Sequence, residues 1–264
     1  MSEEIRLNDS QLGSQEYRRQ PLSAAPPGAS HTDASSWNQF YRKEIENFGQ
    51  NEQDTGECWF DDSGAERKVV DFFCLLVDEH EVPPTARLVD LGTGNGHLLF
   101  ELFETICDEC PDAGLQYHGI DYSPDSVAFA QLIAQRRYPQ QRFTFETVDF
   151  ISQDCAYLAE NAGSFDVLFD KGTLDAIALN NDPVPGFGGK IGSQVYPIQV
   201  EKLMHAGSLL ILTSCNFTEA ELIQLITQNG TNALRVWRKI SYPSFKFGGV
   251  AGSTICSIAF VKDK

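Results

Sequence analysis

Near the start of this chain, apolar side chains recur at three- and four-residue steps. Five of them fall at this spacing between residues 35 and 50: Trp37, Phe40, Tyr41, Ile45 and Phe48. This period predicts an amphipathic helix. A second helical pattern covers residues 63–79, after a polar loop. Ser63 and Glu66 have the spacing of a capping box, so we expect the second helix to begin with that motif.

Beyond residue 85 the pattern changes to short apolar runs separated by segments of helix length. Seven runs read as strands: 86–91, 115–120, 142–148, 165–169, 208–214, 233–242 and 253–261. Amphipathic stretches lie between the first five runs, at about 97–110, 124–137, 154–160 and 195–205. This alternation predicts an α/β fold, a mostly parallel seven-stranded sheet with helices on both faces. The last two runs are close in sequence, so we expect an antiparallel hairpin at one edge.

The first 34 residues are polar, with no apolar period. Such a segment cannot bury enough surface to offset the entropy of ordering it, so we expect residues 1–34 to form a disordered tail. The remaining residues, 35–264, then form one domain. Within it we expect an N-terminal helical cap, 35–85, and a core, 86–264.

Acidic residues outnumber basic ones, 37 to 20, which gives a formal net charge of −17. Binding to nucleic acid depends on clustered lysine and arginine, so this balance argues against a nucleic-acid partner and favours a basic one. The seven cysteines are odd in number and scattered, which is typical of reduced thiols. Cys107 and Cys110 form a C-x-x-C pair, but no second pair stands at zinc spacing, so we expect no metal.

No apolar run approaches the roughly 18 residues that a membrane-spanning helix needs. The first residues also lack the features of a secretory leader or an organelle transit peptide. We therefore expect a soluble protein in the cytosol or nucleus, with the cytoplasm as the leading location and no membrane partner. We also expect a monomer.

The stretch from Asp90 to Gly96 joins a predicted strand to a predicted helix. Gly92, Gly94 and Gly96 allow a tight bend and close approach of the backbone to a ligand. The third glycine comes one residue too early for dinucleotide binding, which disfavours a nicotinamide-dependent oxidoreductase. Asp90 does not help to bind a phosphate but suits a cationic ligand. S-adenosylmethionine is such a ligand, because it carries a sulfonium and an ammonium group and no phosphate.

Acids also stand at the ends of the next two predicted strands. Asp121 can accept hydrogen bonds from both hydroxyls of a ribose. Asp149, followed by Phe150, can accept from the adenine amino group with an apolar side chain beside the ring. The carboxyl ends of parallel strands meet at one edge of an open sheet, where ligands bind. We therefore predict that these acids surround a cofactor.

The motifs resemble those of the seven-β-strand S-adenosylmethionine-dependent methyltransferases. More narrowly, "DTGECWF", "DKGTLDAIALN" and "TSCNFTEAEL" are similar to the lysine methyltransferases acting on translation elongation factor 1-alpha, the group of yeast elongation factor methyltransferase 4 and its animal counterpart. The resemblance covers about residues 37–262. It implies a Rossmann-like sheet with a final antiparallel hairpin, S-adenosylmethionine as cofactor and elongation factor 1-alpha as protein substrate.

The resemblance also implies the site residues. The cofactor-binding residues are then Trp59, Phe60, Asp90, Gly92, Gly94, Gly96, Asp121, Asp149, Phe150 and Asp170. Asp170 is also the catalytic residue that the resemblance implies, because it faces the methyl-transfer centre. We expect Asp170 to align the substrate ammonium, with the proton leaving through water or to Asp170 itself.

The residues after Asp170 are expected to have structural roles. A like charge would repel the substrate lysine, so we expect Lys171 to turn toward another acid or solvent. Thr173 and Asp175 are expected as the N-cap and a first-turn acid of the next helix. The segment 181–193 is rich in proline and glycine and is expected to form a mobile flap near the substrate.

Three other functions stay open. They are a methyltransferase for another protein or a small molecule, a nicotinamide-dependent oxidoreductase, and a binding scaffold with a methyltransferase-like fold. Thermal stabilisation by S-adenosylhomocysteine but not by NAD would favour a methyltransferase, and stabilisation by neither would favour the scaffold.

Overall fold

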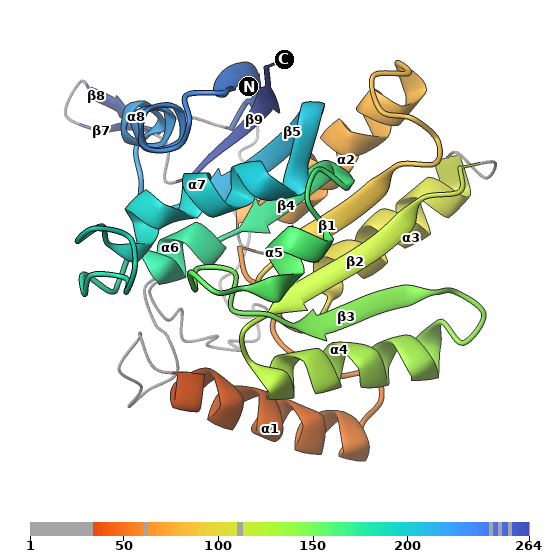
Figure 1. Ribbon diagram of the computed structural model, residues 1–264. Helices are drawn as coiled ribbons and strands as arrows, with labels where there is room; N and C mark the ends of the chain where they lie inside the picture. Colours follow the sequence, from red (N-terminus) through yellow and green to blue (C-terminus); the bar gives the residue numbers. More distant parts are fainter. Residues whose placement is uncertain are drawn as a thin grey trace, which may run out of the picture.

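Seven strands form one sheet at the centre of the molecule, in the order β3-β2-β1-β4-β5-β9-β6 (Figure 1). The computed structural model describes residues 34–60, 63–109, 113–242, 245–247, 250–252 and 255–263. The strands of the sheet are β1 (Arg87–Leu91), β2 (Gln116–Asp121), β3 (Phe143–Thr147), β4 (Phe165–Lys171), β5 (Met204–Ser214), β6 (Leu234–Ile240) and β9 (Cys256–Lys262). Each overlaps one of the predicted runs, so the predicted seven-stranded α/β fold is confirmed.

Strand directions also agree with the prediction. β1 pairs in parallel with β2 and β4, β2 with β3, and β4 with β5. β9 lies between β5 and β6 and runs antiparallel to both, which confirms the antiparallel hairpin at one edge. The connection from β6 to β9 contains a further small hairpin of β7 (Phe245–Phe247) and β8 (Val250–Gly252), which the sequence pattern did not predict.

Helices cover both faces of the sheet. The core on one face includes side chains of α1 (Ala34–Gln50), α2 (Ala65–Asp78), α3 (His97–Glu109) and α4 (Pro124–Arg137). The core on the other face includes side chains of α5 (Ala156–Glu160), α6 (Thr173–Ile177), α7 (Gly192–Leu203) and α8 (Glu219–Asn229). Successive strand side chains point to opposite faces, so in β1 Leu88 joins the first core and Val89 the second.

The strand order reverses direction at β1 and β4. From β1 the chain adds β2 and β3 on one side, and then β4 and β5 on the other. Ligands of open α/β sheets bind outside the carboxyl ends of the strands at such a point. In Figure 1, β2, β3 and β4 point toward the left-hand side, and α1 runs alongside α4 at the bottom of the molecule.

The starts of α2 and α8 differ in how they are capped. α2 begins at Ala65 after Gly64, and the predicted capping box is wrong because Glu66 turns to His97 and Lys171 instead of its own helix start. A capping box does form at α8, where Thr218 accepts from the amide of Glu221 and Glu221 accepts from the amide of Thr218. The same spacing thus caps α8, where Glu221 is exposed, and not α2, where Glu66 is buried with cationic neighbours.

The predicted tail lies almost wholly outside the described residues, which begin at Ala34. The boundaries between tail, cap and core therefore stay predictions. In the described ranges, no helix combines the length and the apolar character needed to cross a membrane.

Candidate functional site

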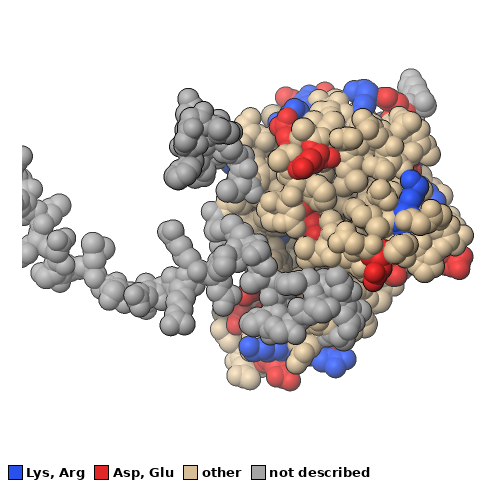
Figure 2. Space-filling model, turned by 90° about the vertical axis from the view of Figure 1, so that its left-hand side faces the viewer, with Lys and Arg blue, Asp and Glu red and all other residues tan. Residues whose placement is uncertain are grey.

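Three predicted acids lie at the ends of neighbouring strands and are all buried. Asp90 in β1, Asp121 in β2 and Asp170 in β4 are 4%, 7% and 1% exposed. Burial raises the pKa of Asp90 to about 7 and that of Asp170 to about 8, and it also raises the pKa of Asp121. Figure 2 looks onto the side of the molecule toward which these strands point, and most of its described surface there is uncharged.

Asp121 holds the glycine loop in place. Its two carboxylate oxygens accept the amide N–H groups of Gly94, at 3.0 Å, and of Ser123, at 2.9 Å. A carboxylate offers about four acceptor positions, so positions remain for the two hydroxyls of a ribose. Ser123 caps α4 through the amide of Ser126, which fixes where β2 ends and where the Asp121 side chain stands.

Gly92 is required by the packing of the loop. Its φ is +69°, and a Cβ there would lie 2.2 Å from the hydroxyl oxygen of Thr173. Thr173 is itself fixed, because its hydroxyl donates to the carbonyl of Leu91 at 2.6 Å. The glycine loop and the start of α6 are thereby locked together.

We expect Gly92→Ala to lower the free energy of unfolding by about 2 to 4 kcal/mol, from left-handed backbone strain plus overpacking. Gly188→Ala is the matched control: its φ is +63° but nothing lies within 4 Å of its Cβ position. It should cost only about 1 to 2 kcal/mol. Chemical denaturation of the variants measures this, and equal losses would show that contact with Thr173 does not constrain the loop.

The N-terminal helix covers the glycine loop, which the sequence did not reveal. A Cβ on Gly94 would lie 2.7 Å from the hydroxyl oxygen of Tyr41, a buried residue of α1. Burial, followed by the nearby charge of Asp121, raises the pKa of Tyr41, so its hydroxyl keeps its proton. The apolar period of α1 had indicated packing only, and nothing else in the sequence distinguishes Tyr41 from its aromatic neighbours.

Trp59 and Phe60 come from the loop between α1 and α2, and they contact the turn between β4 and α6. A Cβ on Gly172 would lie 2.6 Å from the Phe60 ring, and Phe60 itself has a φ of +70°, uncommon for a bulky residue. The Trp59 carbonyl accepts from Lys171 Nζ at 2.8 Å, and the Trp59 ring contacts Trp37 of α1, with centroids 5.7 Å apart. Their role in closing a cofactor pocket stays a prediction.

Lys171 turns toward another acid, as predicted. Its ammonium lies 3.2 Å from a carboxylate oxygen of Glu66 in α2. Burial acts to raise the pKa of Glu66, but a hydrogen bond with His97 and the charge of Lys171 outweigh it and lower the pKa to about 2. Lys171 therefore joins α2 to β4.

Asp170 is held by three groups. Its carboxylate accepts the amide N–H groups of Thr173, at 2.9 Å, and Leu174, at 3.1 Å, and the hydroxyl of the buried Tyr196 at 2.7 Å. These bonds favour the ionised form and partly oppose the effect of burial on its pKa. Tyr196 had no distinguishing signal in the sequence, because it lies in an apolar segment of α7.

The start of α6 differs from the prediction in one residue. Gly172 is the N-cap, so the expectation that Thr173 caps this helix is wrong: Thr173 is its first residue, and its hydroxyl is engaged by Leu91. Asp175 is in the first turn, as predicted, and accepts from the hydroxyl of Ser214 at 2.5 Å. It also accepts from the amide of Cys215 at 2.8 Å, which ties α6 to the end of β5.

Asp149 and Phe150, the predicted adenine contacts, have different surroundings. Asp149 is exposed, and its carboxylate accepts from the amide of Ile151 at 3.2 Å. Phe150 is buried, with its ring 5.8 Å from that of Tyr196. Their contact with a cofactor stays a prediction. The mobile flap at 181–193 also stays a prediction, and within this segment an isolated antiparallel β-bridge joins Pro183 to Ile191.

The residues at the strand ends fit S-adenosylmethionine in their chemistry. Buried carboxylates are stable only when they are protonated or paired, and the pKa values of Asp90 and Asp170 are raised because burial outweighs the hydrogen bonds that favour their ionised forms. A ligand with a sulfonium and an ammonium group supplies the missing positive charge. Asp121 at the end of β2 supplies acceptors for a ribose, and no clustered cations suited to a phosphate are part of this set.

This set of acids predicts a pH dependence. Carboxyls titrate near pH 4 in an unfolded chain, so between about pH 4 and 8 the folded state binds more protons through Asp90 and Asp170, and these two acids make stability fall as pH rises. Ionised carboxylates attract a cationic ligand, so S-adenosylmethionine should raise Tm more at about pH 8 than at about pH 6. Thermal melts at both values measure this. Asp90→Asn should reduce the difference, and a shift independent of pH would contradict the assignment of the acids.

The sequence matches the family described as Methyltransferase domain over residues 84–249. Among solved structures, it is similar to magnesium protoporphyrin IX methyltransferase from Synechocystis PCC 6803 with bound S-adenosylmethionine. That likeness has a TM-score of 0.53 and 17% identity, and covers 90% of this chain and all of the other. Fold, glycine loop and family together define this protein as an S-adenosylmethionine-dependent methyltransferase.

Two relatives narrow the class. Protein-lysine N-methyltransferase EFM4 of Saccharomyces cerevisiae is 42% identical over 226 residues, which cover 86% of this chain and 92% of the relative. EEF1A lysine methyltransferase 2 of Mus musculus is 28% identical over 226 residues, which cover 86% of this chain and 81% of the relative. The chain belongs to the EFM4 family of protein-lysine N-methyltransferases.

Proposed function

We propose that this chain transfers the methyl group of S-adenosylmethionine to a lysine side chain of translation elongation factor 1-alpha. The observation that carries the proposal is the 42% identity with EFM4, which extends over 86% of this chain and 92% of the relative. The mouse relative is named for the elongation factor as its substrate. The buried acids at the strand ends are consistent with this chemistry, because both the cofactor and a substrate lysine are cationic.

In this proposal the strand ends bind the cofactor. Asp90, with Gly92, Gly94 and Gly96, surrounds its methionine end, and Asp121 binds its ribose. Asp149 and Phe150 receive the adenine, while Trp59 and Phe60 close the pocket. When bound there, S-adenosylmethionine supplies an electrophilic methyl group on a positively charged sulfur.

Asp170 prepares the lysine for attack. A lysine amine has an ordinary pKa of about 10.4, so it arrives as an ammonium and must lose a proton before it can attack. Asp170 is fixed by Thr173, Leu174 and Tyr196, and a carboxylate with three such partners keeps an acceptor position free. A pKa of about 8 lets Asp170 align the ammonium and accept its proton, directly or through water. Placement of the amine in line with the methyl group supplies much of the rate.

We further propose that the enzyme acts as a cytoplasmic monomer on this protein substrate, with no nucleic-acid or membrane partner. The net charge of −17 supports a basic protein partner over a nucleic acid. The flap at 181–193 then lies near the substrate.

Labelling of an unfractionated lysate tests the choice of substrate. The purified chain and S-adenosylmethionine with a labelled methyl group are incubated with a lysate of cells that lack the endogenous enzyme, and the labelled protein and lysine are identified. We expect label on elongation factor 1-alpha. Label on another protein, or on a small molecule, would replace this substrate and keep the methyltransferase, and label on nucleic acid would overturn the proposal of a protein substrate.

A further inference from the structure

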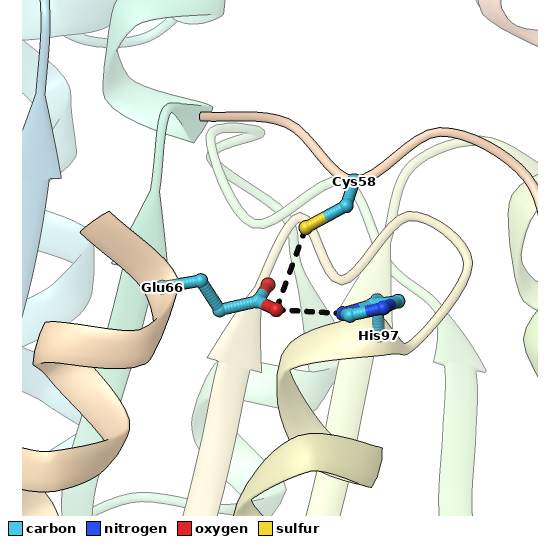
Figure 3. Close-up of side chains that lie close together, drawn as sticks. All are labelled: Cys58, Glu66 and His97. Atoms are coloured by element: carbon cyan, nitrogen blue, oxygen red, sulfur yellow. Dashed lines mark hydrogen bonds and ion pairs between the residues drawn. The ribbon is translucent and has the colours of Figure 1, made fainter. Parts of the chain in front are cut away.

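Cys58, Glu66 and His97 form a cluster that methyl transfer does not use. They come from the loop before α2, from α2 and from the start of α3, and their side chains point toward one another (Figure 3). One carboxylate oxygen of Glu66, Oε1, lies 2.6 Å from His97 Nδ1 and 3.4 Å from Cys58 Sγ. The thiol sulfur, the imidazole nitrogen and the carboxylate oxygen all lie within 4.8 Å of one another.

The two oxygens of Glu66 have different partners. Oε1 faces Cys58 and His97, whereas Oε2 lies 3.2 Å from the ammonium of Lys171. Glu66 is 7% exposed, so its carboxylate cannot turn freely to solvent. Lys171 therefore orients the carboxylate from behind, as the outer partners of metal-binding carboxylates do, and leaves Oε1 directed into the cluster.

These ligand types and spacings suit zinc. Thiolate, imidazole and carboxylate bind Zn²⁺ at about 2.3, 2.0 and 2.1 Å, which places tetrahedral ligand atoms about 3.3 to 3.6 Å apart. The present separation of sulfur and carboxylate oxygen, 3.4 Å, already falls in that range. The separation of carboxylate and imidazole, 2.6 Å, has to open by about 0.7 Å to reach it. A soft sulfur ligand disfavours Mg²⁺ and Ca²⁺, which prefer oxygen.

We propose that Cys58, Glu66 and His97 bind a zinc-class divalent cation through Sγ, Oε1 and Nδ1, with the fourth position open to water. The metal takes the place of the hydrogen bonds that now join the three side chains. It joins the segment directly before Trp59 and Phe60 to the helix that follows the glycine loop. The side chain of His97 is 28% exposed, which gives an ion access to the cluster. The site does not depend on the proposed function, because binding needs neither cofactor nor lysine.

Cobalt binding tests the proposal by spectroscopy. The full chain carries Cys107→Ser so that the C-x-x-C pair makes no contribution, and it is first stripped of metal with a chelator. Titration with Co²⁺ should give one bound ion per chain, with a thiolate-to-cobalt charge-transfer band in the near ultraviolet and the strong visible bands of four-coordinate cobalt. Zn²⁺ should displace the cobalt, abolish both bands and raise Tm.

Variants assign the ligands. Cys58→Ser should remove the charge-transfer band and weaken metal binding by more than about tenfold, and His97→Gln should weaken it comparably. Cys155→Ser, which changes a half-buried cysteine elsewhere in the chain, should leave the spectrum and the affinity unchanged. Circular dichroism confirms that each variant is folded. No cobalt spectrum in the parent, or a band that survives Cys58→Ser, would overturn the proposal and leave the cluster as a hydrogen-bonded clamp.

Discussion

Asp170→Asn is expected to lower kcat for methyl transfer by about 100-fold or more, within the range for loss of a positioned acid or base. The variant preserves the shape of the side chain but removes its charge, so it can no longer align a substrate ammonium or take its proton. The amide oxygen can still accept from Thr173, and we therefore expect the fold and measurable binding of S-adenosylhomocysteine to be retained. Single-turnover kinetics with saturating cofactor measures the effect.

Two variants serve as controls for Asp170. Asp166→Asn changes an acid at the opposite end of the same strand, where it accepts from the amide of Arg87, and it should leave kcat unchanged. Tyr196→Phe removes a bond that favours the ionised carboxylate, so the pH profile of kcat should move to higher pH. If methyl transfer by Asp170→Asn is undiminished, Asp170 has no part in the mechanism.

Asp121→Ala is expected to weaken binding of S-adenosylhomocysteine by about 100-fold or more. Hydrogen bonds to a charged group contribute about 1.5 to 3 kcal/mol each, and losing two of them costs at least about 3 kcal/mol, or two factors of ten. The change also frees the amides of Gly94 and Ser123, which loosens the glycine loop. Isothermal titration calorimetry measures the dissociation constant.

Asp125→Ala provides the comparison for Asp121. Asp125 lies four residues further along, in the first turn of α4, and pairs with the exposed Arg42 at 3.0 Å. Its loss should change cofactor binding by less than about threefold, because surface ion pairs contribute little. Thermal melts of both variants separate lost binding from lost folding. If Asp121→Ala binds the cofactor within about threefold of the unchanged protein, the ribose assignment is wrong.

The period of apolar residues was sufficient to predict the sheet. Runs such as residues 165–169 are buried on both faces except at the half-buried Asp166, so they are mostly apolar and stand out from the helical segments between them. The short hairpin of β7 and β8 has no such run, and α8 was missed although Thr218 and Glu221 carry a capping signal. Patterns set by burial were thus easier to detect than patterns set by local turns.

The site was predicted less completely than the fold. Asp90 and Asp121 could be named because they stand at the ends of predicted strands, and parallel strands bring such ends to one edge, whereas Asp170 was named through the family resemblance. The sequence did not identify three further features of the site: Tyr41, Tyr196 and the cluster around Glu66. Their contacts join elements far apart in the sequence, such as α7 with β4. The amino-acid sequence alone does not show which side chains the packing brings into contact.

Intact-protein mass spectrometry of purified elongation factor 1-alpha measures whether this chain methylates the factor. The unmodified factor is incubated with the chain and S-adenosylmethionine, and peptide fragmentation locates any added methyl groups. We expect methylation of a lysine, lost with Asp170→Asn and with Asp121→Ala and retained with Asp125→Ala. An unchanged mass with an enzyme that binds S-adenosylmethionine, or equal methylation by the Asp170 and Asp121 variants, would contradict it.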